Sequence, residues 1–299
     1  MIHYLSAERD LVQAEGDPLT GHGLLALGDP AFDESSVAGA SEAAFRGTRS
    51  GCPDFQSVRF ESLPASMKEV DAVVALWNQA QGGRTKVAVP SPMVPSGALR
   101  LTGAAASESA FKAQAAGRRI LHIATHGFFL DGRCAASPDP SDKSTAASAA
   151  KVVKQNPLVL SGLILAGANH RNATAPDQED GVLTAEEVAA LDLNGVEWAV
   201  LSGCDTGVGE VRAGEGVFGL RRAFQAAGAR TVIMTLWPVE DQTTRQWMTT
   251  LYRARLTRKL STATAVREAG LALLGGRRTR GLSTHPFYWA AFVAAGDWR

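Results

Sequence analysis

The chain has 299 residues, of which 45% are hydrophobic and 20% are charged, so it can bury a full core without disulfides or metals. Its 30 basic and 30 acidic side chains give a formal net charge of zero, which argues against a surface built for nucleic acid or an anionic membrane. The sequence shows no apolar core of signal-peptide length at its start and no run long enough to span a membrane. We therefore expect a soluble, cytoplasmic protein.

The three cysteines are Cys52, Cys134 and Cys204. Their number is odd and their spacing is wide, so they match neither a disulfide framework nor a CxxC metal or redox motif. This pattern favours a reducing compartment, and we expect no metal or other cofactor.

The first half of the chain alternates apolar runs with an amphipathic segment. The apolar run over 24–27 is followed by Gly-Asp-Pro, which predicts a buried strand with a sharp end. Apolar residues recur three, four and seven positions after Val70, which predicts a helix over 66–81. Further along we expect a strand over 98–101, a helix from the cap residue Ser107 to about Ala116, and a strand over 120–125 that ends at His126-Gly127.

The second half begins with a long polar run over 131–156, which indicates a functional loop, an insertion or a disordered segment. Strand character returns over 158–165, and Thr184 is a cap for a short helix. Strands that alternate with helices predict an α/β fold with a mostly parallel sheet covered on both faces. The remaining expected elements are strands over 198–201 and 231–236, helices over 217–227, 242–256 and 262–274, and a final edge strand over 285–293.

Cys204 follows the apolar run over 198–201 and comes directly after Gly203. Glycine lets the backbone turn sharply, and the carboxyl edge of a parallel sheet is where open α/β folds place their ligands. One interpretation makes Cys204 a nucleophile. The other makes it a buried structural residue, since free cysteine is among the most buried residue types.

His126 also follows an apolar strand and stands beside a glycine, 78 positions before Cys204 (204 minus 126). Two parallel strands that end side by side would bring the imidazole to the thiol, which needs a base to become a strong nucleophile. The N–H groups of Gly127 and Cys204 could then stabilise a developing oxyanion. Taken alone, His126 is also explained as a histidine at the end of a core strand.

Other chemistries have less support. His122 and His126 stand four apart, as in a zinc helix motif, but the motif's glutamate is missing and the flanks are typical of a strand. We therefore expect His122 to be a core residue and expect no metal site. Position 210, where a phosphatase loop needs arginine, is Glu210, and neither a Gly-x-Ser-x-Gly elbow nor a phosphate-binding loop is present.

Glu240 and Asp241 closely follow the strand expected over 231–236. They are explained either as first-turn acids that favour the dipole of the next helix or as the wall of a pocket for a basic substrate side chain. Glu215, between two glycines, is expected to be an acid at the start of a helix rather than a catalytic group.

Six motifs in this order resemble those of CHAT domains, which are caspase- and separase-like cysteine peptidases of bacteria. The resemblance covers nearly the whole chain, roughly residues 2–297. The usual Ser-Ala-Cys is Ser-Gly-Cys here, which we expect to be a mild change. The motifs are HIATHG at 122–127, DGVLTAEEV at 180–188, LSGCDTG at 201–207, GEGVFGL at 214–220, TLWPVED at 235–241 and HPFYWAAF at 285–292, and LLALGDPAF at 24–32 also fits.

This resemblance implies a caspase-like three-layer α/β/α sandwich with a mostly parallel sheet. It places His126 at the position of the catalytic histidine and Cys204 at that of the nucleophile. Gly127 and the amide of Cys204 would form the oxyanion hole.

The resemblance also implies residues that bind substrate. Glu240 and Asp241 match the region that, in the separase relatives, helps to hold a basic side chain at P1, the substrate residue whose carbonyl is attacked. Ser202 matches a position that lines the P1 pocket in caspases. We therefore expect a cysteine endopeptidase that cleaves after a basic residue, in a bacterial regulatory or defence pathway.

CHAT domains usually follow tetratricopeptide helical repeats. We expect residues 1–23 to be the remnant of a longer domain and residues 24–299 to be the CHAT domain. The expected partners are a protein or peptide substrate and either a regulatory protein or the missing repeats, with no nucleic acid and no membrane. The alternatives are a catalytically silent or truncated interaction module and a thiol hydrolase that acts on a small amide.

Overall fold

The computed structural model describes residues 20–34, 45, 53–82, 96–130, 157–175, 178–203 and 215–299. The segment 1–19, the polar run over 131–156 and all three cysteines lie outside these ranges. The predictions for them are therefore not tested by the structure.

The described residues form alternating strands and helices, as the sequence predicts. The strands are β1 (His22–Pro30), β2 (Ala98–Gly103), β3 (Arg118–Ala124), β4 (Gly127–Phe129), β5 (Ser161–Ile164), β6 (Val182–Thr184), β7 (Trp198–Ser202), β8 (Thr231–Thr235) and β9 (Phe292–Gly296). The helices are α2 (Pro53–Ser57), α3 (Pro64–Gly82), α4 (Glu108–Ala115), α5 (Ala185–Ala189), α6 (Glu215–Ala226), α7 (Asp241–Tyr252) and α8 (Thr262–Thr279), with short 3-10 turns at Pro157–Val159, Ala168–Ala173 and Pro286–Tyr288.

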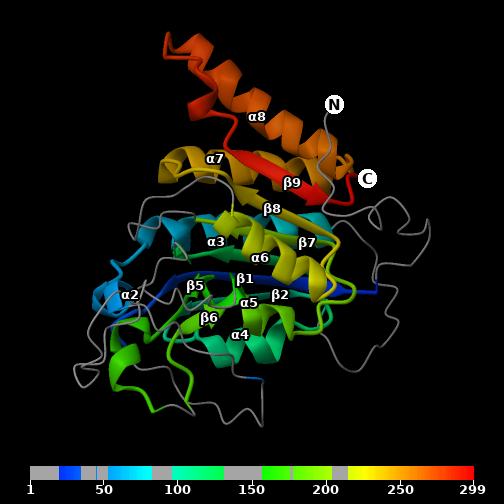
Figure 1. Ribbon diagram of the computed structural model, residues 1–299. Coiled ribbons are helices and arrows are strands. Elements are labelled where there is room, and N and C mark those ends of the chain that lie inside the picture. The colour runs from blue at the N-terminus through cyan, green and yellow to red at the C-terminus, as the bar shows by residue number, and fades with distance from the viewer. Residues whose placement is uncertain are drawn as a thin grey trace.

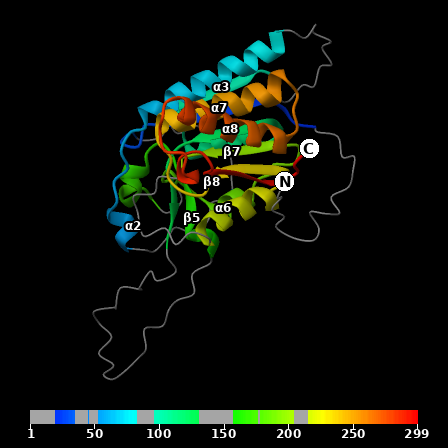
Figure 2. The ribbon, with the colours of Figure 1, turned by 90° about the horizontal axis from the view of Figure 1, so that it is seen from above.

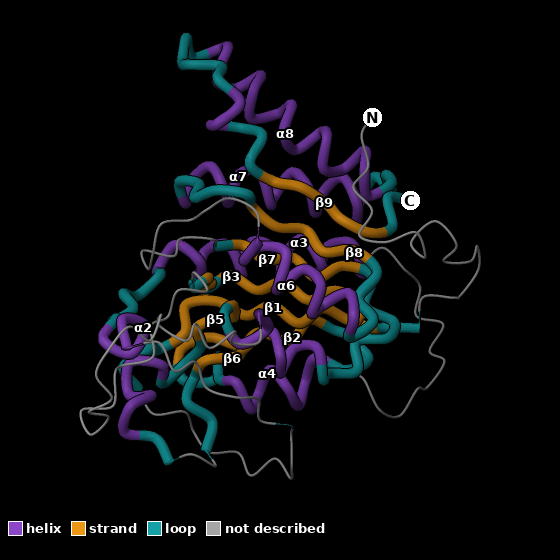
Figure 3. The backbone as a smooth tube through the Cα atoms, viewed as in Figure 1, coloured by secondary structure: helices purple, strands orange, loops and turns teal. Residues whose placement is uncertain are grey.

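A six-stranded sheet in the order β2-β1-β3-β7-β8-β9 runs through the centre of the molecule (Figures 1 and 3). Its first five strands are parallel, and β9 pairs antiparallel with β8 at the edge. The predicted mostly parallel sheet is confirmed. A second, antiparallel sheet has the order β4-β5-β6 and was not expected as a separate unit.

Helices cover both faces of the main sheet, which confirms the three-layer α/β/α architecture. Seen from above, α3, α7 and α8 lie on one face and α6 on the other (Figure 2). The strands are apolar on both sides because both sides are buried. On the α3 face, Trp77, Trp198 and Trp247 are each at most 1% exposed.

Among the described helices, none combines the length and hydropathy needed to cross a membrane.

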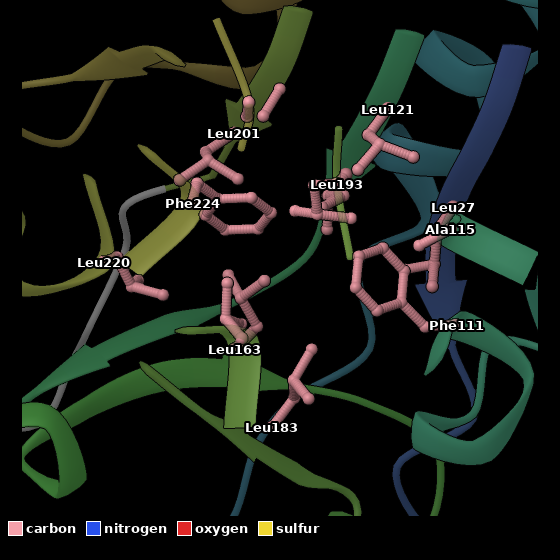
Figure 4. Packing of buried hydrophobic residues seen from close by; sticks show 14 of the residues in the cluster. Leu27, Phe111, Ala115, Leu121, Leu163, Leu183, Leu193, Leu201, Leu220 and Phe224 are labelled. Atoms are coloured by element: carbon pink, nitrogen blue, oxygen red, sulfur yellow. The ribbon is translucent and has the colours of Figure 1, made fainter. Parts of the chain in front are cut away.

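Buried side chains form one hydrophobic core on the α3 face and a second one on the opposite face. The second core lies between the main sheet, the small sheet and helices α4, α5 and α6 (Figure 4). Phe111 and Phe224 are its largest side chains and are almost fully buried. Burial of each such side chain stabilises the fold by about 1.5–3 kcal/mol. Leucines of the small sheet, Leu163 and Leu183, pack into the same core, so that sheet is fixed against the main one.

Both predicted helix caps are confirmed. The Ser107 hydroxyl accepts a hydrogen bond from the N–H of Ala110 at 3.2 Å and begins α4. Thr184 begins α5 with a full capping box, in which the Thr184 N–H donates to the Glu187 carboxylate at 2.9 Å. Such reciprocal bonds satisfy donors that a helix start leaves without partners.

Three predicted boundaries are wrong. The final edge strand starts at Phe292, because Pro286 opens a 3-10 turn that replaces the beginning of the strand predicted over 285–293. The strand predicted over 158–165 is limited to β5 and follows another 3-10 turn. The helix predicted over 262–274 continues to Thr279. The helix predicted over 242–256 is confirmed, as α7 followed by a π-helical turn over Arg253–Thr257.

Candidate active site

His126 stands two positions beyond the end of β3, at the carboxyl edge of the main sheet. Its Nε2 atom is 2.9 Å from the backbone oxygen of Glu61. Because a carbonyl oxygen only accepts, Nε2 carries the proton, and in the neutral ring Nδ1 keeps a lone pair. His126 is therefore held in a tautomer that can act as a base through Nδ1.

Aromatic rings fix the place of this imidazole. Phe32 and Phe60 lie 5.4 and 5.9 Å from the His126 ring, between centroids. The buried Arg171 guanidinium donates to carbonyl oxygens of segment 55–58 and stands 5.3 Å from the Phe60 ring. These contacts tie down the segment that leads to the carbonyl partner of His126.

Gly127 follows directly and opens β4. The N–H of Ile164 donates to the oxygen of His126 at 2.8 Å, which makes residues 126 and 164 a hydrogen-bonded pair of the antiparallel ladder. The next pair, Gly127 with Leu163, is then a non-hydrogen-bonded one, so the N–H of Gly127 points away from β5. A Cβ atom at Gly127 would lie 3.7 Å from the Gly203 oxygen, so the backbone of Gly127 is close to the end of β7.

Gly203 leaves the end of β7 in a conformation that requires glycine. Its φ is +122°, and a Cβ atom there would lie 2.4 Å from the oxygen of Thr125. Alanine would be strained and would clash with backbone. The expectation that Gly203 is only a mild change from the alanine usual in the family is therefore wrong for this backbone.

A pocket of about 170 Å³ opens at the ends of β3, β7 and β8. His126, Ser202 and Gly203 line it from the sheet edge, together with Thr235 of β8. Glu69 lines it from α3. This volume is far more than the roughly 10–15 Å³ that one water needs, so the pocket can receive a side chain.

Glu69 belongs to a buried polar network on that side of the sheet. Its Oε1 atom lies 3.1 Å from Nε2 of His122, although the alignment falls outside hydrogen-bond geometry. Nδ1 of His122 is 3.1 Å from the hydroxyl of Tyr252. Burial, with the charge of Glu69 as a second cause, raises the pKa of Tyr252, so Tyr252 keeps its proton. His122 is fully buried, which confirms that it is a core residue.

The remaining predicted site residues are placed only in part. Glu240 is exposed at the N-cap of α7 and accepts a hydrogen bond from the Thr243 hydroxyl at 3.3 Å. It does not line the pocket, but its neighbour Val239 does. The side chain of Asp241 and the whole of Cys204 lie outside the described residues.

A second buried acidic cluster, on the α4 side, could hold a metal ion by its spacing, but a lysine occupies it. Ligand atoms of Glu108, Glu179 and Glu187 lie within 4.8 Å of one another. Lys112 Nζ contacts them at 2.8, 3.1 and 3.0 Å in that order. Burial alone would lower the pKa of Lys112. The surrounding carboxylates together have the larger, opposite effect, so the pKa of Lys112 is raised well above its ordinary value.

Sequence reasoning missed two groups that the site contains. Glu69 stands four and seven positions before Val73 and Leu76, so it is an acid on the apolar face of α3, and that misplaced charge was a usable signal. The backbone oxygen of Glu61 had no signal, because any residue supplies a carbonyl.

A family model described as the CHAT domain matches residues 1–297 of the chain. Tetratricopeptide repeat protein 28 of Homo sapiens and that of Mus musculus are both 32% identical over 122 residues, which are 41% of this chain. The chain spans 5% of the length of these curated relatives. Among solved structures, the Arg-specific cysteine proteinase gingipain R (RgpB) has a TM-score of 0.46 at 10% identity, over 94% of this chain and 47% of that one. The complex of the Porphyromonas gingivalis RgpB pro- and mature domains has the same score and identity, over 94% and 48%.

Proposed function

Since the chain belongs to the CHAT domain family, we propose that it is a cysteine endopeptidase with Cys204 as nucleophile and His126 as general base. The observation that carries the proposal is the His126 ring, whose Nε2 lies 2.9 Å from the Glu61 carbonyl oxygen, an arrangement that leaves Nδ1 as the basic nitrogen. The strand register supports it. Ala124 of β3 pairs with Ser202 of β7, and His126 and Cys204 each follow two positions later.

In the proposed reaction, Nδ1 of His126 takes the proton from the Cys204 thiol. The thiolate attacks the carbonyl carbon of the scissile peptide bond, and the N–H groups of Gly127 and Cys204 hold the resulting oxyanion. The C–N bond then breaks, and the leaving amine takes the proton from His126. Water, activated by His126, hydrolyses the thioester and restores the thiol.

The proposed substrate is a protein or peptide with Arg or Lys at P1, the residue whose carbonyl is attacked. The pocket beside His126 has the size for a side chain, and Ser202 lines it. Glu240 stands next to the pocket-lining Val239, and Asp241 follows it, so these acids would favour a basic residue at the entrance.

Tetratricopeptide repeats are the proposed partner of the domain, because the curated relatives are named for such repeats. The same observation favours a second candidate function. The domain could keep its fold as an interaction module for a repeat protein without cleaving anything, since those names record no peptidase.

The test is cleavage of a peptide library that varies P1, comparing the parent chain with Cys204→Ala and His126→Ala. Turnover after Arg or Lys should fall about a thousandfold or more in each variant. Cys134→Ala is the matched control and should leave turnover unchanged. Cleavage that survives in Cys204→Ala would refute the proposal.

A peptide electrophile that reacts with thiols distinguishes the interaction module from the peptidase. A peptidase should direct the electrophile to Cys204 ahead of Cys52 and Cys134, because a thiolate beside a base reacts fastest. Equal labelling of the three cysteines, with no turnover from folded protein, favours the module.

A further inference from the structure

We propose that Glu69 is the carboxylate that pairs with the basic P1 side chain in the pocket beside His126. This inference rests on the proposed function and names the residue that would determine its specificity. Glu69 lines the same pocket as His126, and its side chain is only 6% exposed. Among the described residues that line the pocket, Glu69 is the one with an acidic side chain.

The charge of Glu69 lacks a cationic partner among the described residues. Its near polar neighbour is His122, whose Nε2 faces the carboxylate while Nδ1 faces the Tyr252 hydroxyl. The Tyr252 hydroxyl can donate to Nδ1 of His122, whereas Nε2 lies 3.1 Å from the carboxylate without hydrogen-bond geometry, so His122 leaves this carboxylate oxygen without a bonded donor. No Lys or Arg in the described part of the chain forms an ion pair with Glu69, so a buried negative charge borders the pocket without compensation.

The rest of the pocket wall suits a long basic side chain. Leu63, Ala65 and Val239 provide apolar surface for its methylene stem. Thr235 provides a hydroxyl that is buried and has no hydrogen-bond partner in the described residues. An ammonium or guanidinium group that enters here could donate to both the carboxylate and this hydroxyl.

Glu69 is better placed than Glu240 to select the substrate. Glu240 is exposed, where water screens its charge and an ion pair contributes little. A substrate cation at Glu69 would meet a carboxylate that is already out of water, and the attraction there is stronger. The exposed acid attracts basic peptides in general, whereas the buried acid discriminates between P1 residues.

The experiment compares two peptides that differ only at P1, one with arginine and one with citrulline, its uncharged analogue. The parent protein should cleave the arginine peptide faster. In Glu69→Gln, kcat/KM for the arginine peptide should fall roughly 10- to 100-fold, the worth of a hydrogen bond to a charged group, while that for citrulline stays near its parent value. Asp71→Asn is the matched control on the same helix, since Asp71 is half-exposed and pairs with Arg100.

Binding provides a second readout that needs no catalysis. In a Cys204→Ala background, calorimetry should show the arginine peptide bound more tightly than the citrulline peptide, and Glu69→Gln should abolish the difference. Thr235→Val should reduce it without the loss of a charge, which keeps the test available if Glu69→Gln does not fold. An unchanged preference in folded Glu69→Gln, or a preference lost in Glu240→Gln instead, overturns the inference. A parent protein that cleaves no peptide but binds arginine over citrulline through Glu69 refutes only the proposed function.

Discussion

Two of the sites where the described residues bury acidic side chains differ in one respect: one contains its own cation and the other does not. On the α4 side, Glu108, Glu179 and Glu187 surround Lys112 at hydrogen-bond distance. On the α3 side, Glu69 faces the ring of His122 and a pocket, and no Lys or Arg of the described residues pairs with it. Both sites contain buried acidic side chains, but their different surroundings give these side chains different roles.

The difference follows from the energetics of buried charge. A carboxylate removed from water loses its hydration, and a partner must compensate for that loss. Lys112 does so permanently, so the α4 cluster joins α4 to α5 and can be expected to contribute to stability. Glu69 has no such partner among the described residues, so its compensation is left to a ligand.

The largest expected effect is from Lys112→Met, which removes the built-in cation. Three carboxyl groups would remain in a buried cluster without a cation, and breaking such an ion pair costs about 3–5 kcal/mol of the free energy of unfolding. Urea unfolding measures the change. Lys68→Met, at an exposed position of α3, is the control and should change little. A loss below about 1 kcal/mol would show that Lys112 is not the compensating charge.

A smaller effect concerns the pH dependence of the same cluster. Burial is the main cause that raises the pKa of Glu108 well above its ordinary value, and Glu179 and Glu187 raise it further, against the effect of Lys112. The folded state therefore keeps a proton that the unfolded state has released. As pH rises from the ordinary glutamate value through the folded pKa, stability should fall by up to about 1.4 kcal/mol per pH unit.

Glu108→Gln should remove this loss, because glutamine resembles the protonated acid and cannot release a proton. Urea unfolding between about pH 5 and pH 8 would show a flatter curve for the variant than for the parent protein. Glu34→Gln, at an exposed position, should retain the parent curve. If Glu108→Gln keeps the parent slope, the proton is held elsewhere.

The comparison also shows how far sequence reasoning reaches. Local patterns predicted α3, the Ser107 and Thr184 caps and the parallel sheet, because spacing and cap chemistry are written in neighbouring residues. The acids proposed for the substrate, Glu240 and Asp241, were chosen by the same local logic, from their place after a strand. Glu69 lies far from His126 in the sequence, and only the packing of α3 on the sheet brings both to one pocket.

The smallest expected effect tests how the cation-free carboxylate is held. Tyr252→Phe removes the hydroxyl that faces Nδ1 of His122, and a buried acceptor left without its donor costs about 1–2 kcal/mol of unfolding free energy. If His122 orients Glu69 for the substrate, the preference for arginine over citrulline at P1 should also fall, by less than in Glu69→Gln. Tyr288→Phe, at an exposed tyrosine, should alter neither quantity. A Tyr252→Phe protein that loses stability but keeps the full preference would show that the network supports the core and leaves Glu69 to be positioned by α3 alone.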